Sequence, residues 1–182
     1  MANTKISQLT TWTGDTTGFY LVVDNSGLTQ TYKTTKESLG AFTPEILLKS
    51  SSVDQTIAVG NNLTFDLTDF NLNMTSPSNS TVTLKANRTY ECRAAMRLTA
   101  GNVAGAEITY RWWNNTAGSY TGITGGAVTT DAGGWTGTDV NEALAYITVG
   151  STDISLQLKV VASSSSAQVS ANQSRITIKR IA

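Results

Sequence analysis

The sequence predicts an all-β protein whose antiparallel strands pack as a sandwich or barrel. Thr, Ser, Asn and Gly are abundant, and these residue types favour strands and the turns that join them. Several segments alternate apolar and polar residues with a period of two, which a helix cannot produce. Turn-rich stretches separate these segments, and many short strands joined by turns are typical of a sandwich or barrel.

The chain divides near residue 44, and residues 1–43 are predicted to contain a β-hairpin. Residues 19–23 (Phe-Tyr-Leu-Val-Val) form an apolar run of strand length. Residues 24–27 (Asp-Asn-Ser-Gly) have the composition of a tight turn, and residues 29–33 supply the second strand.

A short helix is expected to follow this hairpin. Thr34 and Glu37 have the spacing of a capping box, which predicts a helix over about residues 35–39, with Gly40 in position to end it. Pro44 marks the boundary with the rest of the chain. A unit this small cannot bury enough apolar surface to be stable alone. We therefore expect it to dock onto the remaining chain, onto symmetry mates or onto a different protein.

Residues 44–182 contain the alternating segments. The clearest is 88–98, where every second residue from Tyr90 onward is apolar. Residues 142–149 fit a strand, with a helical turn as the alternative. The other predicted strands are 63–67, 82–84, 107–112, 153–160 and 176–178. The turn-rich stretches are 99–105, 114–118, 122–126, 131–137 and 163–166. No internal repeat is visible, which disfavours a propeller or a β-helix.

The residue types argue against an enzyme. The chain has no histidine, which is the commonest general base and the commonest metal ligand. Its only cysteine, Cys92, falls on the apolar face of residues 88–98, so we expect an inert core thiol. No disulfide can form within the chain, so folding does not require an oxidising compartment.

Two carboxylate pairs could in principle support glycoside hydrolysis or bind calcium. They are Asp66 with Asp69 and Asp131 with Asp139. Neither pair lies in a recognised catalytic or calcium-binding pattern, so exposed loop carboxylates are expected. We therefore predict no catalytic residue, no metal ligand and no cofactor.

The charge balance argues against a nucleic-acid partner. Lys+Arg and Asp+Glu each number 13, and binding to phosphate requires an excess of basic residues. Four arginines could form a basic stripe on an outward sheet face, with two glutamates between them: Arg88, Arg93, Arg97, Arg111, Glu91 and Glu107. Cross-strand ion pairs are the simpler interpretation. No run of about eighteen apolar residues predicts a membrane span, and the first residues lack the apolar core of a signal peptide, so we expect assembly in cytoplasm.

Four aromatic residues are candidates for a subunit interface or a glycan contact. Trp112 and Trp113 are adjacent on a predicted strand, so one must fill the core while the other is exposed or buried against another subunit. Tyr120 and Trp135 lie in glycine-rich stretches predicted to be loops. Exposed rings can stack on sugars, but packing at the ends of the barrel or against a neighbour is the favoured interpretation.

The first unit carries a recognisable series of short motifs. Residues 5–9 read Lys-Ile-Ser-Gln-Leu, residues 21–24 read Leu-Val-Val-Asp, and Asp15, Gly27, a threonine-rich stretch and Leu39 accompany them. This series resembles the start of many tailed-phage virion proteins, except that the usual proline of the strand is absent. The resemblance implies a virion protein that attaches through residues 1–43. The implied attachment residues are Ile6, Leu9, Leu21, Val23, Asp24 and Leu39.

Residues 44–182 resemble the jelly roll of the TNF/C1q-like group. The resemblance rests on two segments. They are the Asn-Arg-Thr-Tyr sequence at 87–90, where the long alternating strand begins, and the last predicted strand at 174–181. The aromatic signature of C1q itself is not matched. The resemblance implies an antiparallel jelly-roll sandwich with a small N-terminal hairpin-plus-helix unit, and it implies a homotrimer because this group forms compact trimers.

Three hypotheses follow. The first is a homotrimeric head fibre or capsid decoration protein on the virion surface, anchored to another virion protein (capsid or tail) by residues 1–43 and displaying residues 44–182. The second is a receptor-binding tail fibre or tail tip protein in which Trp113, Tyr120 or Trp135 contacts a host surface glycan. The third, a depolymerase or other hydrolase, is disfavoured by the missing histidine and the missing catalytic motif.

Overall fold

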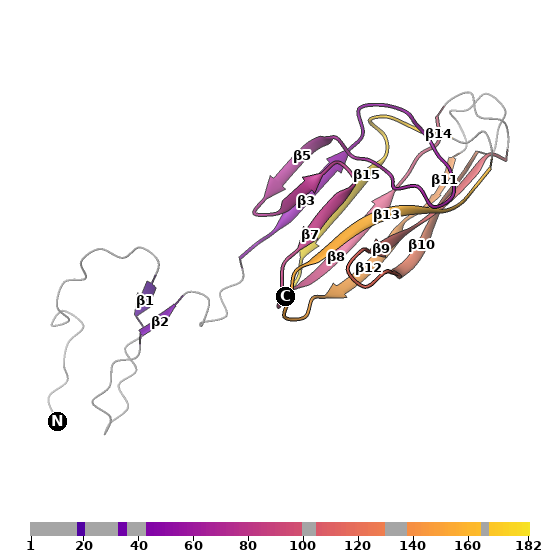
Figure 1. The fold of residues 1–182 in the computed structure, drawn as a ribbon. Helices are drawn as coiled ribbons and strands as arrows, with labels where there is room; N and C mark the ends of the chain where they lie inside the picture. Colours follow the sequence, from indigo (N-terminus) through magenta and orange to yellow (C-terminus); the bar gives the residue numbers. More distant parts are fainter. Residues whose placement is uncertain (1–17, 21–32, 36–42, 100–104, 130–137, 165–167) are drawn as a thin grey trace, which may run out of the picture. The chain divides into compact units, whose positions relative to one another are not determined.

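The computed structural model describes residues 18–20, 33–35, 43–99, 105–129, 138–164 and 168–182 (Figure 1). The chain separates into two compact units, Met1–Thr43 and Pro44–Ala182, here called unit 1 and unit 2. No described residue is helical, so this part of the chain holds no apolar helix that could cross a membrane.

Unit 1 contains one pair of antiparallel strands, β1 (Gly18–Tyr20) and β2 (Lys33–Thr35). Their pairing agrees with the predicted hairpin, whose turn lies outside the described residues. Thr34 and Thr35 were expected to start a helix, but they pair with Phe19 and Gly18 in β2. β-Branched threonine favours a strand once a partner strand is available, which explains the difference. Residues 36–39 of the expected helix lie outside the described residues.

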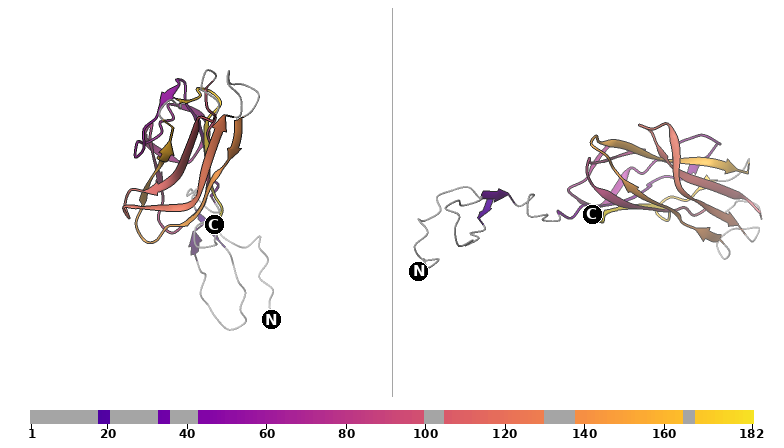
Figure 2. Two further views of the ribbon diagram at one scale, coloured as in Figure 1. Left: turned by 90° about the vertical axis from the view of Figure 1, so that its right-hand side faces the viewer. Right: turned by 90° about the horizontal axis from the view of Figure 1, so that it is seen from below.

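Unit 2 is a sandwich of two antiparallel sheets, seen from two further directions in Figure 2. The six-stranded sheet has the order β11-β10-β9-β13-β7-β6. Its strands are β6 (Thr75–Ser78), β7 (Thr81–Leu84), β9 (Glu107–Asn114), β10 (Ser119–Thr129), β11 (Thr138–Asn141) and β13 (Ile154–Ser163).

The five-stranded sheet has the order β12-β8-β15-β3-β5. Its strands are β3 (Ile46–Ser50), β5 (Leu67–Leu72), β8 (Thr89–Ala95), β12 (Ala143–Thr148) and β15 (Arg175–Arg180). A separate short pair joins β4 (Gln55–Thr56) to β14 (Gln168–Val169). The described residues therefore confirm the all-β, antiparallel prediction.

The core lies between the two sheets and follows the predicted alternation. Apolar residues at alternate positions of β8, β9 and β13 point inward and are buried, and these are Tyr90, Cys92, Ala94, Ile108, Tyr110, Trp112, Leu156, Leu158 and Val160. Burial of one large aliphatic or aromatic side chain stabilises a fold by about 1.5–3 kcal/mol. The polar atoms among them are paired, since the Trp112 indole N–H donates to the Cys92 carbonyl at 3.1 Å.

Residues 142–149 form a strand rather than a helical turn. β12 covers Ala143–Thr148 and pairs with β8 in a continuous register from Ala143↔Ala94 to Thr148↔Thr89. Its residues alternate between buried and more exposed, so its inner face completes the core of the five-stranded sheet.

The predicted strand at 63–67 is wrong in its position. Leu63 and Phe65 are buried, but they lie outside any strand, and β5 begins only at Leu67. Their backbone N–H groups donate to separate acceptors, the carbonyls of Leu158 and Asn79 respectively. Alternating apolar residues indicate which side chains are buried, and they do not by themselves show that the backbone forms a strand. Here each of the two buried residues donates its backbone N–H to a separate acceptor outside any strand pairing.

The predicted turn at 122–126 lies inside β10. The strand has an irregular register between Thr121 and Gly125, where β10 passes close to neighbouring backbone. A Cβ atom at Gly122 would come within 2.3 Å of the Leu144 carbonyl oxygen, and one at Gly125 within 2.4 Å of the Ala143 nitrogen. Gly122 and Gly125 therefore allow the backbone of β10 to lie close to the backbone at Leu144 and Ala143. Close approach of another backbone is a common reason for glycine within a strand.

Candidate functional site

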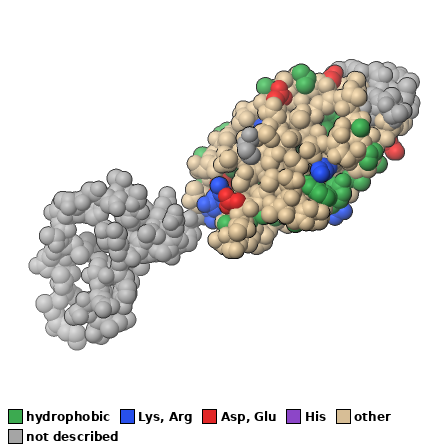
Figure 3. Space-filling view, in the orientation of Figure 1, with side chains coloured by type: hydrophobic (Ala, Val, Ile, Leu, Met, Phe, Trp, Pro, Cys, Tyr) green, Lys and Arg blue, Asp and Glu red, His purple; other side chains and the backbone are tan. Residues whose placement is uncertain are grey.

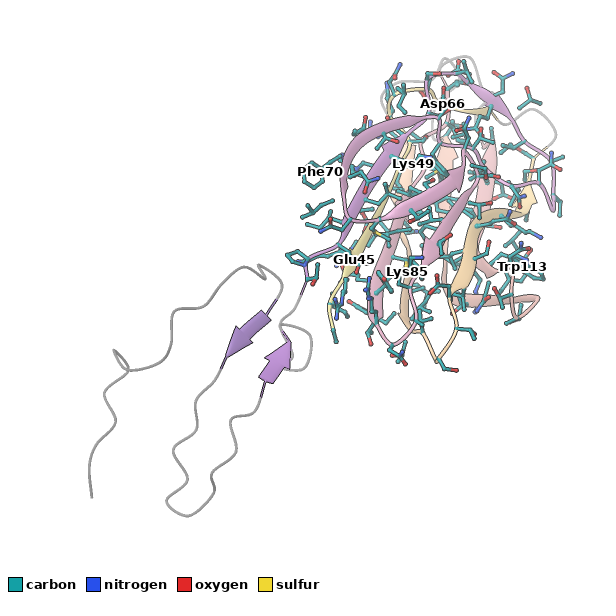
Figure 4. The ribbon with its side chains drawn as sticks, turned by 60° about the vertical axis from the view of Figure 1, so that its left-hand side comes forward. Glu45, Lys49, Asp66, Phe70, Lys85 and Trp113 are labelled. Atoms are coloured by element: carbon teal, nitrogen blue, oxygen red, sulfur yellow. The ribbon has the colours of Figure 1, made fainter. Side chains whose placement is uncertain are left out.

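A buried carboxylate lies at the end of unit 2 where the chain enters the sandwich. Glu45, the second residue of the unit, is only 1% exposed, and its carboxylate accepts hydrogen bonds from the Tyr90 hydroxyl at 2.6 Å and from the Arg88 guanidinium. Arg180 lies 3.9 Å from the same carboxylate, and its backbone N–H donates to the Glu45 carbonyl. Figure 4 shows Glu45 at the start of β3, and Figure 1 shows the C-terminus at this end of unit 2. The cluster fixes the point at which the chain enters the sandwich.

The Cys92 thiol is fully buried on the inner face of β8. Burial raises its pKa well above the ordinary value, so the thiolate needed for nucleophilic attack is not formed near neutral pH. The structure thus places Cys92 in the core, as the sequence predicts.

The paired carboxylates do not act together. Asp66 accepts hydrogen bonds from the backbone N–H and the hydroxyl of Ser52, and these bonds lower its pKa. Asp69 instead accepts from the Ser50 hydroxyl at 3.1 Å. Each carboxylate therefore anchors its own loop or strand. Asp131 lies outside the described residues, so the second pair cannot be placed. Among the described residues, no three Cys, Asp or Glu side chains gather as metal ligands would.

Lys49 is a second buried charge, at the edge of the sandwich. Its side chain points inward from β3, is 4% exposed, and donates to the Ser76 hydroxyl of β6 at 3.1 Å. Burial lowers its pKa, and the nearby Asp66 carboxylate opposes that effect. Figure 4 shows Lys49 and Asp66 on neighbouring parts of the fold. The hydrogen bond links β3 of the five-stranded sheet to β6 of the six-stranded sheet.

The two adjacent tryptophans divide as predicted, with Trp112 in the core and Trp113 on the outer face. Trp113 packs edge-to-face against Tyr120 with ring centroids 4.9 Å apart, and the Lys159 ammonium lies 4.1 Å from the Trp113 ring centroid. Tyr120 belongs to β10, so its expected loop position is wrong. Trp135 lies outside the described residues. Because Lys159 and Tyr120 already contact the Trp113 ring, it is not an open platform for stacking a sugar.

The four arginines do not form one stripe. Arg88 precedes β8, Arg93 lies on it and Arg97 follows it, all along the five-stranded sheet, whereas Arg111 lies on β9 of the six-stranded sheet. Arg93 makes ion pairs with Glu91 on its own strand at 2.8 Å and with Glu142 at 3.5 Å. Ion pairing is thus observed for Arg88 and Arg93, but Glu107 belongs to the other sheet.

The outer face of the five-stranded sheet carries two groups of apolar side chains that are exposed or half-buried. The strand register places its outward residues in two rows across the sheet. The first row is Leu72, Ile46, Lys179, Glu91 and Tyr146. The second row is Phe70, Leu48, Thr177, Arg93 and Leu144.

The apolar residues of both rows fall at opposite edges of that sheet. We call Ile46, Leu48, Phe70 and Leu72 on β3 and β5 patch A. We call Leu144 and Tyr146 on β12 patch B. Phe70 is 50% exposed and Tyr146 is 60% exposed, and Figure 4 shows Phe70 projecting away from the sandwich. Polar and charged residues of β8 and β15 separate the two patches.

The proposed attachment residues cannot be placed by the structure. Ile6, Leu9, Leu21, Val23, Asp24 and Leu39 all lie outside the described residues. Their role stays a prediction from the sequence.

Solved structures share the fold. The globular domain of zebrafish complement 1qA aligns with a TM-score of 0.50 at 8% identity, over 77% of this chain and 96% of that chain. Murine APRIL gives 0.52 at 8% identity, over 76% and 99%, and Eiger TNF from S. frugiperda gives 0.51 at 10%, over 78% and 93%. The chain therefore contains a TNF/C1q-like jelly roll. Neither a protein-family model nor a curated protein matches the sequence.

Proposed function

We propose that this chain is a structural protein of a tailed-phage particle, a homotrimeric head fibre or capsid decoration protein without enzymatic activity. Residues 1–43 attach it to another virion protein, and the jelly roll of residues 44–182 assembles the trimer and displays it on the virion surface. The observation that carries the assembly role is the pair of exposed apolar patches on one sheet.

The arrangement of the patches favours a closed ring. Patch A and patch B differ in composition and lie at opposite edges of the five-stranded sheet. A ring of identical subunits needs such a heterologous contact, in which one surface of each copy meets a different surface of the next. A two-fold dimer would instead bury one self-complementary patch. The TNF/C1q-like fold supports three as the number of copies, because the group forms compact trimers.

The virion role is supported by the first unit. The Lys-Ile-Ser-Gln-Leu and Leu-Val-Val-Asp motifs resemble the openings of tailed-phage virion proteins. The Glu45 cluster holds the chain rigidly where unit 2 begins, which suits a domain that is carried by a separate anchor. Its buried carboxylate accepts a hydrogen bond from Tyr90 of β8 and lies 3.9 Å from Arg180, which pairs with Tyr90 on the neighbouring strand β15.

The assembly role is tested by placing a charge in patch A. Phe70→Asp puts a carboxylate into the proposed contact, where it would be desolvated, so we expect the trimer to dissociate to monomers at micromolar concentration. Val59→Asp is the matched control, since Val59 is 63% exposed and lies outside both patches. Light scattering during size-exclusion chromatography reads the mass. Trimers of both variants would contradict the proposed contact.

The attachment role is tested by deleting residues 1–43. We expect the shortened chain to form a trimer with an unchanged circular dichroism spectrum but to be missing from purified particles. Particles that incorporate the shortened chain at the normal level would contradict attachment through unit 1. Unfolding of the shortened chain would contradict the division into an anchor and an independently assembled jelly roll.

The alternative is a receptor-binding tail fibre or tail tip protein. In that proposal the outer aromatic group of Trp113 and Tyr120 contacts a host surface glycan. The contacts made by Lys159 and Tyr120 to the Trp113 ring reduce its support.

A further inference from the structure

A surface hollow with a volume of 590 Å³ opens on the outer face of the five-stranded sheet. It lies beyond the second row of outward residues, toward the end of β3 opposite Glu45, and Leu48 borders both the hollow and patch A. Volumes of this size are typical of small-molecule binding sites.

Two arginines line this hollow without an acidic partner. Arg97 and Arg175 form no ion pair with any described residue, whereas Arg88, Arg93 and Arg180 all lie within ion-pair distance of glutamates. Both arginines line the same hollow, Arg175 from β15 and Arg97 from the residues that follow the neighbouring strand β8. Guanidinium groups bind carboxylates in a bidentate, charge-assisted manner, so two unpaired ones in one hollow indicate an anionic ligand.

The backbone that carries the two arginines is firmly held. The Arg97 N–H donates to the Ser174 hydroxyl at 3.0 Å, and that hydroxyl is fully buried with its residue. Arg175 pairs in register with Ser50 on one side and Ala95 on the other. The guanidinium groups therefore extend from fixed positions, which reduces the entropy lost when a ligand binds.

The rest of the lining suits a ligand that also carries hydroxyl groups. Asp69 accepts one hydrogen bond from Ser50 and retains further acceptor sites, and Gln173 offers both a donor and an acceptor. Leu67, which lies outside patch A and is exposed, supplies apolar surface for the C–H face of a sugar ring.

We propose that this hollow binds an acidic saccharide, with the ligand carboxylate held by Arg97 and Arg175 and its hydroxyls held by Asp69 and Gln173. This binding activity goes beyond the proposed assembly role. The assembly proposal and the binding proposal can fail separately, because light scattering measures the mass of the assembly and calorimetry measures the heat of ligand binding.

The test is calorimetric titration of the full chain with two acidic probes, trigalacturonate and sialyllactose. Their neutral counterparts are the methyl ester of trigalacturonate and lactose. We expect an acidic probe to bind at least about tenfold more tightly than its neutral counterpart, since the neutral counterpart cannot make charge-assisted hydrogen bonds to the two guanidinium groups. Arg97→Gln and Arg175→Gln should each weaken binding by about tenfold.

Lys85→Gln is the control, because it removes a positive charge that pairs with Asp153 and does not line the hollow. We expect it to bind both probes like the unchanged protein. Failure of both acidic probes to bind, or equal binding of acid and neutral counterpart, would overturn the proposal. Loss of the trimer in the arginine variants without any probe binding would also overturn it, by assigning the arginines to a subunit contact.

Discussion

The outer faces of the two sheets differ although their inner faces are alike. Both sheets bury apolar residues at alternate positions toward one shared core. On the six-stranded sheet the outward positions of β7, β9 and β13 are mostly polar, as at Thr83, Thr109 and Gln157. The exposed large apolar residues of this sheet lie on β10 and β13, and they are Tyr120, Ile123 and Val161. The five-stranded sheet differs in exposing apolar residues at both of its edges, Phe70 on β5 and Tyr146 on β12. Folding requires only the inner faces, so apolar residues at two opposite edges support the proposed contact between copies.

Few hydrophobic or charged side chains lie on the visible surface of unit 2 in the space-filling view (Figure 3). The visible surface of unit 2 consists mainly of uncharged side chains and backbone, with hydrophobic and charged side chains in small separate groups (Figure 3). Threonine and serine make a surface that stays hydrated without charge, which suits a chain with 14% charged residues. An apolar patch on such a surface is a specific feature, and patches of this kind mark interaction sites.

The largest expected loss of stability comes from a substitution in the core between the two sheets. Trp112→Ala removes a fully buried side chain and its hydrogen bond to the Cys92 carbonyl, so we expect a loss of about 3–5 kcal/mol in the free energy of unfolding. Trp113→Ala is the matched control on the outer side of the same strand, with a loss below about 1.5 kcal/mol. Urea unfolding measures both, and similar losses would show that inner and outer faces are not distinct.

The next largest effect concerns the buried charge at the chain entry. Glu45→Ala leaves Arg88 and the Tyr90 hydroxyl without their acceptor, and we expect a loss of about 3 kcal/mol. Glu142→Ala is the control, because that carboxylate is 46% exposed and its ion pair with Arg93 is long. Its expected loss is below about 1 kcal/mol. A Glu45 variant as stable as the Glu142 variant would contradict the stabilising role of the buried Glu45 carboxylate.

A smaller effect should appear at high pH. Burial, followed by the hydrogen bond to Glu45, raises the pKa of Tyr90 from 10.0 to about 12. The folded chain therefore holds this proton more tightly than the unfolded chain. The stabilisation is complete below pH 10 and is lost as the pH rises toward 12.

Tyr90→Phe should flatten the decline in unfolding free energy between pH 10 and pH 12. Tyr146→Phe, at an exposed position on the outer face, should leave the decline unchanged. Urea unfolding at a series of pH values measures the slope, and an equal slope in both variants would contradict the assignment to Tyr90.

The smallest effect belongs to the outer face of the six-stranded sheet. Lys159→Gln removes the ammonium from the Trp113 ring, and we expect a loss of about 0.5–1 kcal/mol with no change in the mass of the assembly. Gln157→Glu, on the same strand, is a control for changing one outward polar residue. Dissociation of the assembly by Lys159→Gln would indicate that the six-stranded sheet makes the subunit contact, and it would contradict a contact through the five-stranded sheet.

The sequence predicts most strands because their burial alternates. In β8 the residues from Tyr90 to Ala94 alternate cleanly, so the strand and its core face can both be read. Leu63 and Phe65 alternate in the same way, but hydrogen bonding, which the pattern does not contain, leaves them outside a strand. Gly122 looks like a turn residue until the neighbouring backbone that requires it is known.

The binding and contact surfaces were missed for a different reason. The apolar run Ile46-Leu47-Leu48 gives no sign that Leu47 points to the core while its neighbours point outward. Arg97 and Arg175 are far apart in the sequence and meet only through the register of β8 and β15. Long-range strand pairing sets both surfaces, and single-sequence patterns do not encode it. The apolar character of Phe70 and Leu72 was the available signal.

The mass of the full chain in solution tests the central claim most directly, since two different patches on one sheet should close a ring. Light scattering at micromolar concentration should give about 58 kDa, three times the 19.3 kDa of one chain. A mass of one or two chains would contradict this ring, because a monomer leaves both patches exposed and a two-fold dimer gives each copy only one neighbour.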